Sequence, residues 1–148
     1  MEKAMITYLK EWLLKCEILK DSRIETEYLS PEDGNDYYSL EQEANTTPLA
    51  KANVLGTLLK GAINYTLAGR FSFDVHNTSV NSDNLKTMQN IVDWITLTNI
   101  NGDKPKIDEN NYVTNIQVTN GPFLLGIDKS TTKSRYEIKI QLDYERRL

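Results

Sequence analysis

The stretch SRYEIKIQLDYERRL, residues 134–148, decides the fold class of this protein. Apolar and polar side chains alternate along it with a period of two, which is typical of a β-strand with one face in a hydrophobic core and the other toward water. The ends of chains usually fray, so a strand this well specified is expected to lie inside a sheet or under a neighbouring subunit. Its apolar residues are Tyr136, Ile138, Ile140, Leu142 and Tyr144.

The same alternation recurs in INYTLAGRFSFDV, residues 63–75, and predicts a long strand. Two shorter strands are predicted at residues 24–30 and 37–40, separated by the turn-forming residues PEDGND, 31–36. Residues 41–60 show no clean period, so we expect a loop there with one helical turn.

Near the C-terminus, Asn120-Gly121 separates two apolar stretches, YVTNIQVT and PFLLGID. Asn-Gly favours the two-residue turn of a β-hairpin, because both residues accept the positive φ angles that such a turn requires. The sequence therefore predicts a three-strand meander over residues 112–148.

Two amphipathic helices are predicted. Residues 82–98 place apolar side chains on one arc of a helical wheel, with Ser82 as the N-cap. The first 20 residues predict a helix of about five turns with an apolar stripe. The stripe consists of Met5, Ile6, Tyr8, Leu9, Trp12, Leu13, Cys16 and Leu19.

Together these elements predict an α+β fold in a single domain over residues 1–148. We expect a mostly antiparallel sheet of four to five strands with the two main helices packed on one face. The predicted core contains Phe71, Phe73, Ile91, Ile95, Ile138, Ile140 and Leu142.

The composition narrows the classes of function. The chain has 148 residues and a net charge of −4, which argues against a general binder of nucleic acid or anionic membranes. Its single cysteine, Cys16, excludes an internal disulfide and favours a reducing compartment. No stretch near the N-terminus has the continuous apolar core of a signal peptide or membrane span, so we expect a protein made in the cytosol.

The sequence offers no catalytic constellation. His76 is the only histidine, and Cys16 lies in the apolar stripe of the first helix, where it is expected to be a small buried hydrophobe. Residues 97–108 keep some offsets of a calcium-binding loop, but Leu97 stands where the first ligand is needed. We therefore predict a protein that is not an enzyme and has no catalytic, cofactor-binding or metal-binding residues.

Several features together resemble phage neck proteins of Gram-positive siphophages, the "minor capsid protein" family, whose fold is related to that of tail terminators. They are the aromatic strand YTLAGRFSFDV, the helix NLKTMQNIVDWI with its central tryptophan, the Asn-Gly dipeptide and the final strand YEIKIQLDYERR. They fall within residues 63–148; the N-terminal helix and short strands fit the layout more loosely, and residues 41–60 do not match it.

The resemblance implies a ring, typically of six subunits, at the head-proximal end of the tail tube. Such a ring ends tube growth and joins the tube protein to the head connector or stopper protein, while DNA passes through without being read and no membrane is involved. The protein would be made in the host cytoplasm and end in the neck of the virion. The residues expected at the subunit interface are Tyr37, Tyr38, Leu40 and Arg70.

Two alternatives stay open beside the terminator. One is another ring or adaptor protein of the phage neck or tail. The other is a small ligand-binding or enzymatic α+β domain of unknown substrate, which a sheet-lined pocket with converging polar groups would favour.

Overall fold

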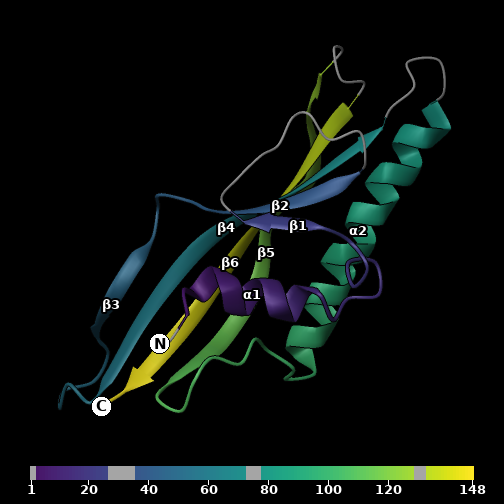
Figure 1. Cartoon of the computed structure of the whole chain (residues 1–148). Helices are drawn as coiled ribbons and strands as arrows, with labels where there is room; N and C mark the ends of the chain where they lie inside the picture. The colour runs from purple at the N-terminus through teal and green to yellow at the C-terminus, as the bar shows by residue number, and fades with distance from the viewer. Residues whose placement is uncertain (1–2, 27–35, 73–77, 129–132) are drawn as a thin grey trace.

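The computed structural model describes residues 3–26, 36–72, 78–128 and 133–148, shown in Figure 1. These residues form an α+β fold whose sheet is mostly antiparallel, as the sequence predicts. The helices are α1 (Met5–Leu13) and α2 (Thr78–Ile100). The strands are β1 (Ile24–Thr26), β2 (Tyr37–Gln42), β3 (Thr47–Lys51), β4 (Leu58–Ser72), β5 (Asn111–Asp128) and β6 (Lys133–Arg147).

The sheet has six strands rather than the four to five expected from the sequence. Its order is β1-β2-β4-β6-β5, with β3 paired to β4 beyond the end of β2; among the described strands, only the β1–β2 pair is parallel. β6 lies between β4 and β5 and pairs with β4 along its whole length, from Lys133 to Arg147. The strong alternation of the last strand is thus explained by a central place in the sheet.

The prediction of a loop over residues 41–60 is wrong. Within this segment lies β3, which pairs with the first part of β4, and β4 itself begins at Leu58. The side chains of β3 are exposed except for that of Leu49, which is half-buried. A strand with both faces largely in water leaves no apolar alternation, so only its pairing with β4 defines it.

The predicted hairpin turn at Asn120-Gly121 is also wrong, because β5 continues through both residues. The register with β6 shifts on each side of Asn120, so the positive φ of Gly121, 93°, serves a bulge instead of a chain reversal. A Cβ at this position would lie 2.5 Å from the carbonyl oxygen of Glu137. The glycine therefore allows the two backbones to approach closely, and the expected three-strand meander is a two-strand hairpin.

Both helices differ in length from the prediction. α1 ends at Leu13, because after Leu14 the amides bond three residues back instead of four: Lys15 N bonds to Trp12 O at 3.1 Å and Cys16 N to Leu13 O at 3.0 Å. The turns that follow still bury Cys16 and Leu19, so the apolar stripe is longer than the helix. α2 begins at Thr78, which places the expected N-cap, Ser82, inside the helix.

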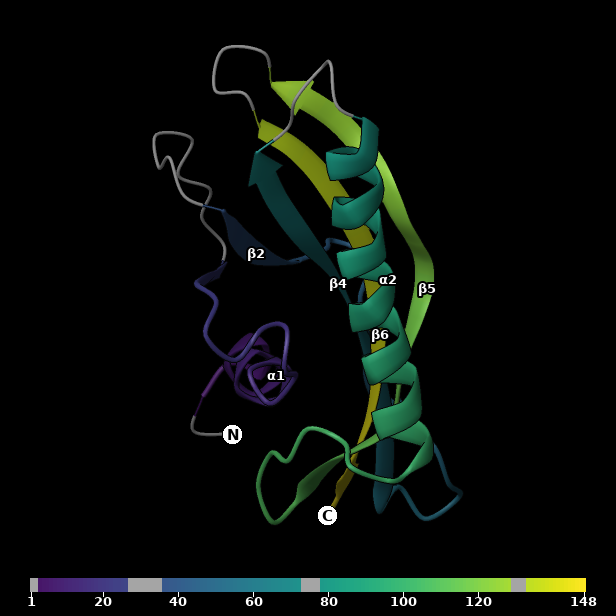
Figure 2. The same ribbon diagram turned by 90° about the vertical axis from the view of Figure 1, so that its right-hand side faces the viewer.

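One face of the sheet forms the core together with both helices. α1 contributes Leu9 and Leu13 to it, and α2 runs along β5 and β6 (Figure 2). The helices meet at Trp12 and Trp94, whose ring centroids lie 4.6 Å apart. The predicted core residues Phe71, Ile91, Ile95, Ile138, Ile140 and Leu142 are all buried in this cluster, while Phe73 lies outside the described residues. We call the side of the sheet that packs against α1 and α2 the covered face.

Candidate functional site

The opposite side of the sheet, which we call the polar face, carries a grid of charged and hydroxyl side chains. The register places Tyr37 opposite Arg70, and Thr66 opposite Lys139. The grid is formed by Tyr37, Ser39 and Glu41 of β2, Thr66, Ala68 and Arg70 of β4, and Arg135, Glu137 and Lys139 of β6. None of these residues belongs to the cluster that packs against the helices.

The four predicted interface residues divide between the two faces. Tyr38 and Leu40 lie on the covered face and are 5% and 0% exposed, so they serve the core of the subunit. Burial raises the pKa of the Tyr38 hydroxyl to about 12. Tyr37 and Arg70 meet on the polar face, where the guanidinium lies 5.9 Å from the ring centroid. Tyr37 is itself 1% exposed within the subunit, and a role of any of the four residues in an interface stays a prediction.

A hydrogen-bonded trio occupies the middle of the polar face. Glu43, just after β2, accepts bonds on Oε1 from Thr66 Oγ1 at 2.6 Å and from Lys139 Nζ at 2.7 Å. Lys139 Nζ also lies 2.8 Å from Thr66 Oγ1 and 3.5 Å from Glu137 Oε2. The trio ties β2, β4 and β6 together across the sheet.

These contacts shift the pKa values of the two ionisable groups in the trio, Glu43 and Lys139. The hydrogen bonds from Lys139 and then from Thr66 lower the pKa of the Glu43 carboxyl. Burial alone would lower the pKa of Lys139, but its bond to Glu43 and the negative charges of Glu137 and Glu43 outweigh that effect and raise it. Both groups are held in their charged forms at neutral pH.

The network continues along β6 toward β2. Arg135 Nε donates to Glu137 Oε1 at 3.0 Å, and Arg135 Nη2 lies 3.6 Å from Glu41 Oε1. The Glu137 side chain is only 8% exposed, which requires the two cations beside it. Within the described part of the chain, the buried Ser39 Oγ, Glu41 Oε1 and Arg70 Nε have no hydrogen-bond partner. Of these atoms, Glu41 Oε1 still lies within ion-pair distance of Arg135.

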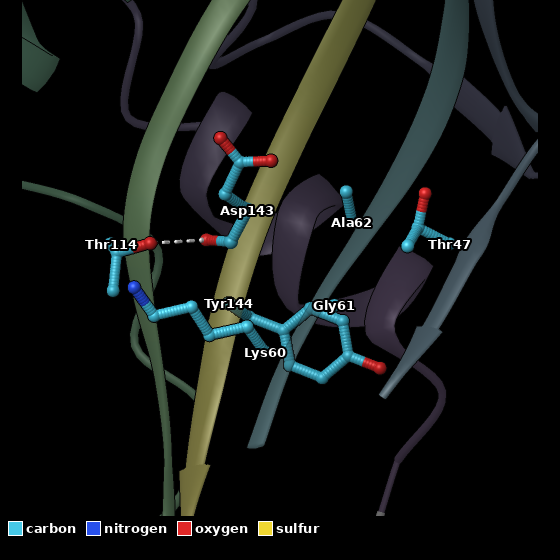
Figure 3. Close-up of a pocket in the computed structure, with 7 residues that line it drawn as sticks. All are labelled: Thr47, Lys60, Gly61, Ala62, Thr114, Asp143 and Tyr144. Atoms are coloured by element: carbon cyan, nitrogen blue, oxygen red, sulfur yellow. Dashed lines mark hydrogen bonds between the residues drawn. The ribbon is translucent and has the colours of Figure 1, made fainter. Parts of the chain in front are cut away.

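A shallow pocket of about 300 Å³ lies beside β4 and β6 (Figure 3). The Tyr144 ring packs over Gly61, where an added Cβ would lie 3.0 Å from the ring. The Lys60 amine, the Asp143 carboxylate and the Thr47 hydroxyl come from different strands and lie apart from one another (Figure 3). Polar groups arranged in this way do not converge on one ligand atom.

Large apolar side chains are exposed at the two ends of the long sheet. At one end Val54 and Leu55 form the tip of the β3–β4 hairpin and are 91% and 84% exposed. At the other end Leu124 and Leu125 of β5 are 47% and 56% exposed. The hairpin tip is not among the residues expected from the sequence; its only signal there is two adjacent large apolar residues before Gly56 in a segment without a period.

The residues considered for chemistry remain isolated where the structure describes them. Cys16 is 1% exposed, and burial raises the pKa of its thiol. His76 lies outside the described residues. Over the described ranges, no three His, Cys, Asp or Glu side chains gather as they would around a metal ion. Neither α1 nor α2, as described, is both long and apolar enough to cross a membrane.

Comparison with known proteins does not identify a family for this chain. No family model matches the chain. No curated protein matches it either.

Proposed function

We propose that the protein is a structural subunit of a phage neck, a tail terminator that forms a ring at the head-proximal end of the tail tube. The resemblance of residues 63–148 supplies the type of assembly. The observation that carries the proposal is the pair of exposed apolar surfaces at opposite ends of the sheet, Val54-Leu55 and Leu124-Leu125. Contiguous exposed apolar surface on a soluble protein marks contact sites.

The polar face suits a subunit that must select its neighbours. Its cations and carboxylates largely neutralise one another, through Lys139 with Glu43 and Arg135 with Glu137. A surface of this kind gains little from a free ion but discriminates among protein partners by their charge pattern. In the proposed ring its partly exposed members, Lys139 and Glu43 with side chains 32% and 26% exposed, would contact another protein, either the head connector or the tail tube.

Assembly on the tail tube tests the proposal. The purified protein, mixed with polymerising tube protein of its own phage, is expected to yield capped tubes of fixed length in electron micrographs. Native mass spectrometry of the capped ends should find a ring, with six copies expected from the resemblance. Tubes that keep growing, with none of this protein at their ends, would remove the terminator assignment.

Duplex DNA tests the channel of the proposed ring. Basic residues lining a pore would hold phosphates through counterion release, and a ring would multiply each contact. The net charge of −4 and the exposed acids Asp108 and Glu109 agree with a wall that lets the duplex slide. We expect weak or no binding at physiological salt; a complex at micromolar concentration or tighter in a gel-shift titration, weakening steeply with salt, would contradict this.

The alternative of a ligand-binding or enzymatic domain is tested on the same preparation. Elemental analysis of the purified protein is expected to find no stoichiometric metal ion, and His76→Ala and Cys16→Ser should leave capping intact if the fold survives. A tightly held metal, or loss of capping in a folded His76→Ala variant, would favour the alternative.

A further inference from the structure

Arg70 of β4 lies on the polar face without an anionic partner in the part of the chain that the structure describes. No described carboxylate lies within ion-pair distance of its guanidinium, and its buried Nε has no hydrogen-bond partner. A buried guanidinium nitrogen that has lost water without gaining an acceptor costs free energy. An unsatisfied group of this kind in a folded protein calls for a physical explanation.

The other four arginines of the chain each bond a polar side chain. Their partners are Glu25 for Arg23, Glu137 for Arg135, Asn111 for Arg146 and the Tyr112 hydroxyl for Arg147. Arg70 is thus the exception among the described arginines, and its donors are left for a group outside the subunit.

The sheet register places Arg70 between an arginine and an aromatic ring. Arg135 of β6 is its direct cross-strand neighbour on one side, and Tyr37 of β2 on the other. Like charges directly opposite each other on neighbouring strands are unfavourable. The carboxylates of Glu137 and Glu41, at 3.0 and 3.6 Å, lie against Arg135 and leave Arg70 without compensation. A carboxylate arriving from outside would relieve this repulsion and accept the missing hydrogen bonds.

The Tyr37 ring restricts the Arg70 side chain before any ligand binds. The Arg70 Cζ lies 5.9 Å from the ring centroid, and the Arg23 Cζ lies 4.7 Å from the same centroid. The ring itself is fixed, because Tyr37 is 1% exposed. A guanidinium held in this way loses less conformational entropy on binding, and its planar fork matches the two oxygens of a carboxylate.

The surroundings of Arg70 favour a single carboxylate over a phosphate polymer. The nearby cations Arg23, Arg135 and Lys139 are already paired with Glu25, Glu137 and Glu43. Duplex DNA needs several cations that neutralise successive phosphates, and the paired acids would repel it. One acidic side chain on a protein surface can reach the one unpaired guanidinium between these pairs.

We propose that Arg70 binds the carboxylate of an aspartate or glutamate on the neck protein that contacts the polar face. The proposal rests on the proposed function, since it names the chemical group that this face recognises in its partner. Arg70 is half-buried, so the pair is largely removed from water when the two proteins meet. Desolvated arginines of this kind are among the residues that contribute most to protein interfaces.

Unfolding of the free subunit tests whether Arg70 is unpaired there. Arg70→Met keeps the apolar stem against Tyr37, and we expect the urea midpoint to stay the same or rise, because no partner is orphaned. Arg135→Met is the contrast and should lower the midpoint, because Glu137, 8% exposed, loses one of its cations. A loss in Arg70→Met as large as in Arg135→Met would show that Arg70 serves the fold of the subunit, and would overturn the proposal.

Binding to purified tail tubes and to purified head connector tests the external carboxylate. Arg70→Met is expected to raise the dissociation constant for one of the two partners about tenfold or more. Arg70→Lys should recover only part of the loss, because an ammonium lacks the planar fork. The matched control is Lys86→Met, which removes one exposed cation from α2 and should leave both dissociation constants unchanged.

The remaining outcomes separate this proposal from the proposed function. Wild-type binding that persists unchanged in Arg70→Met would overturn the carboxylate site and leave the terminator intact. Wild-type protein that binds neither tubes nor connector would overturn the proposed function and this inference with it. Binding of inorganic phosphate or short duplex DNA that is lost in Arg70→Met would assign the site to phosphate and overturn the proposal.

Discussion

The two faces of the same sheet bury their side chains through different interactions. On the covered face, side chains such as Ile138 and Ile140 are 0% exposed against two helices and need no polar partner. On the polar face, Thr66 and Glu137 are 4% and 6% exposed, yet each is held by hydrogen bonds or ion pairs. The difference shows that low exposure in this protein has two physical meanings, hydrophobic packing on one side and charge compensation on the other.

The largest effect is expected on the covered face. Ile140→Ala should lower the free energy of unfolding by about 2–5 kcal/mol, through lost transfer free energy and the cavity left behind. The matched control is Gln141→Ala, one residue on and on the other face, which should change stability by about 0.5 kcal/mol or less. Thermal and urea unfolding measure both; equal losses would mean that the two faces do not differ as described.

The next effect tests compensation on the polar face. Glu137→Gln keeps the shape of the side chain but removes the charge that Arg135 and Lys139 share, so a loss of about 1–3 kcal/mol is expected. Glu25→Gln is the control, because the Glu25–Arg23 pair is 36% and 41% exposed and should contribute little. An unchanged or raised stability in Glu137→Gln would show that this buried charge is not compensated.

A smaller effect is expected for the partly exposed Glu43–Lys139 pair on the polar face, and it should depend on pH. A double-mutant cycle of Glu43→Gln and Lys139→Met should give a coupling of about 0.5–1 kcal/mol near neutral pH, since both side chains are partly exposed. The Glu43 pKa is lowered in the folded state, so its contribution is present above its ordinary value of 4.5 and is lost as the pH falls through the folded value.

At basic pH, the loss of the stabilising contribution depends on the ionisation of Lys139. Its pKa is raised by folding, so its contribution is complete below the ordinary value of 10.5 and is lost as the pH rises through the folded value. Urea unfolding of the four proteins of the cycle across the pH range measures both limits. A coupling that persists well below the folded pKa of Glu43 would contradict the ionic origin of the contact.

The smallest effect lies off the sheet. Glu17 is 87% exposed and pairs with Lys20 Nζ at 3.0 Å, so Glu17→Gln should leave the free energy of unfolding nearly unchanged. This substitution gives the baseline for an exposed ion pair. A loss as large as that of Glu137→Gln would erase the distinction between compensated burial and surface pairing.

The sequence predicted the covered face well and the polar face poorly. Alternation at Ile138, Ile140 and Leu142 and helical spacing at Ile91 and Ile95 both report the same apolar core, so the α+β class and most of the core followed from local patterns. For the polar residues between them, the alternation predicts only that they face water. Charged residues on neighbouring strands neutralise one another only in register, and register is not visible within one strand.

The errors in the fold have the same origin in long-range pairing. β3 is a strand because it pairs with β4, and its exposed side chains leave no periodic signal. Asn120-Gly121 satisfies the rule for a hairpin turn, but β5 stays paired with β6 on both sides of these residues, so the glycine lies in a bulge and not in a turn. In both places tertiary context overrides the local preference.

The central place of β6 also has a kinetic consequence. Its contacts with β4 join residues far apart in the chain, from Ser72 with Lys133 to Leu58 with Arg147. Loop-closure entropy opposes such pairings until several have formed, and proteins dominated by them fold in milliseconds to seconds rather than microseconds. The β5–β6 hairpin, joined by a short connection, is the natural early structure, with β4 and β2 docking onto it later. During that interval the free edge of β6 is open to strands from other chains, so refolding yield should fall as protein concentration rises.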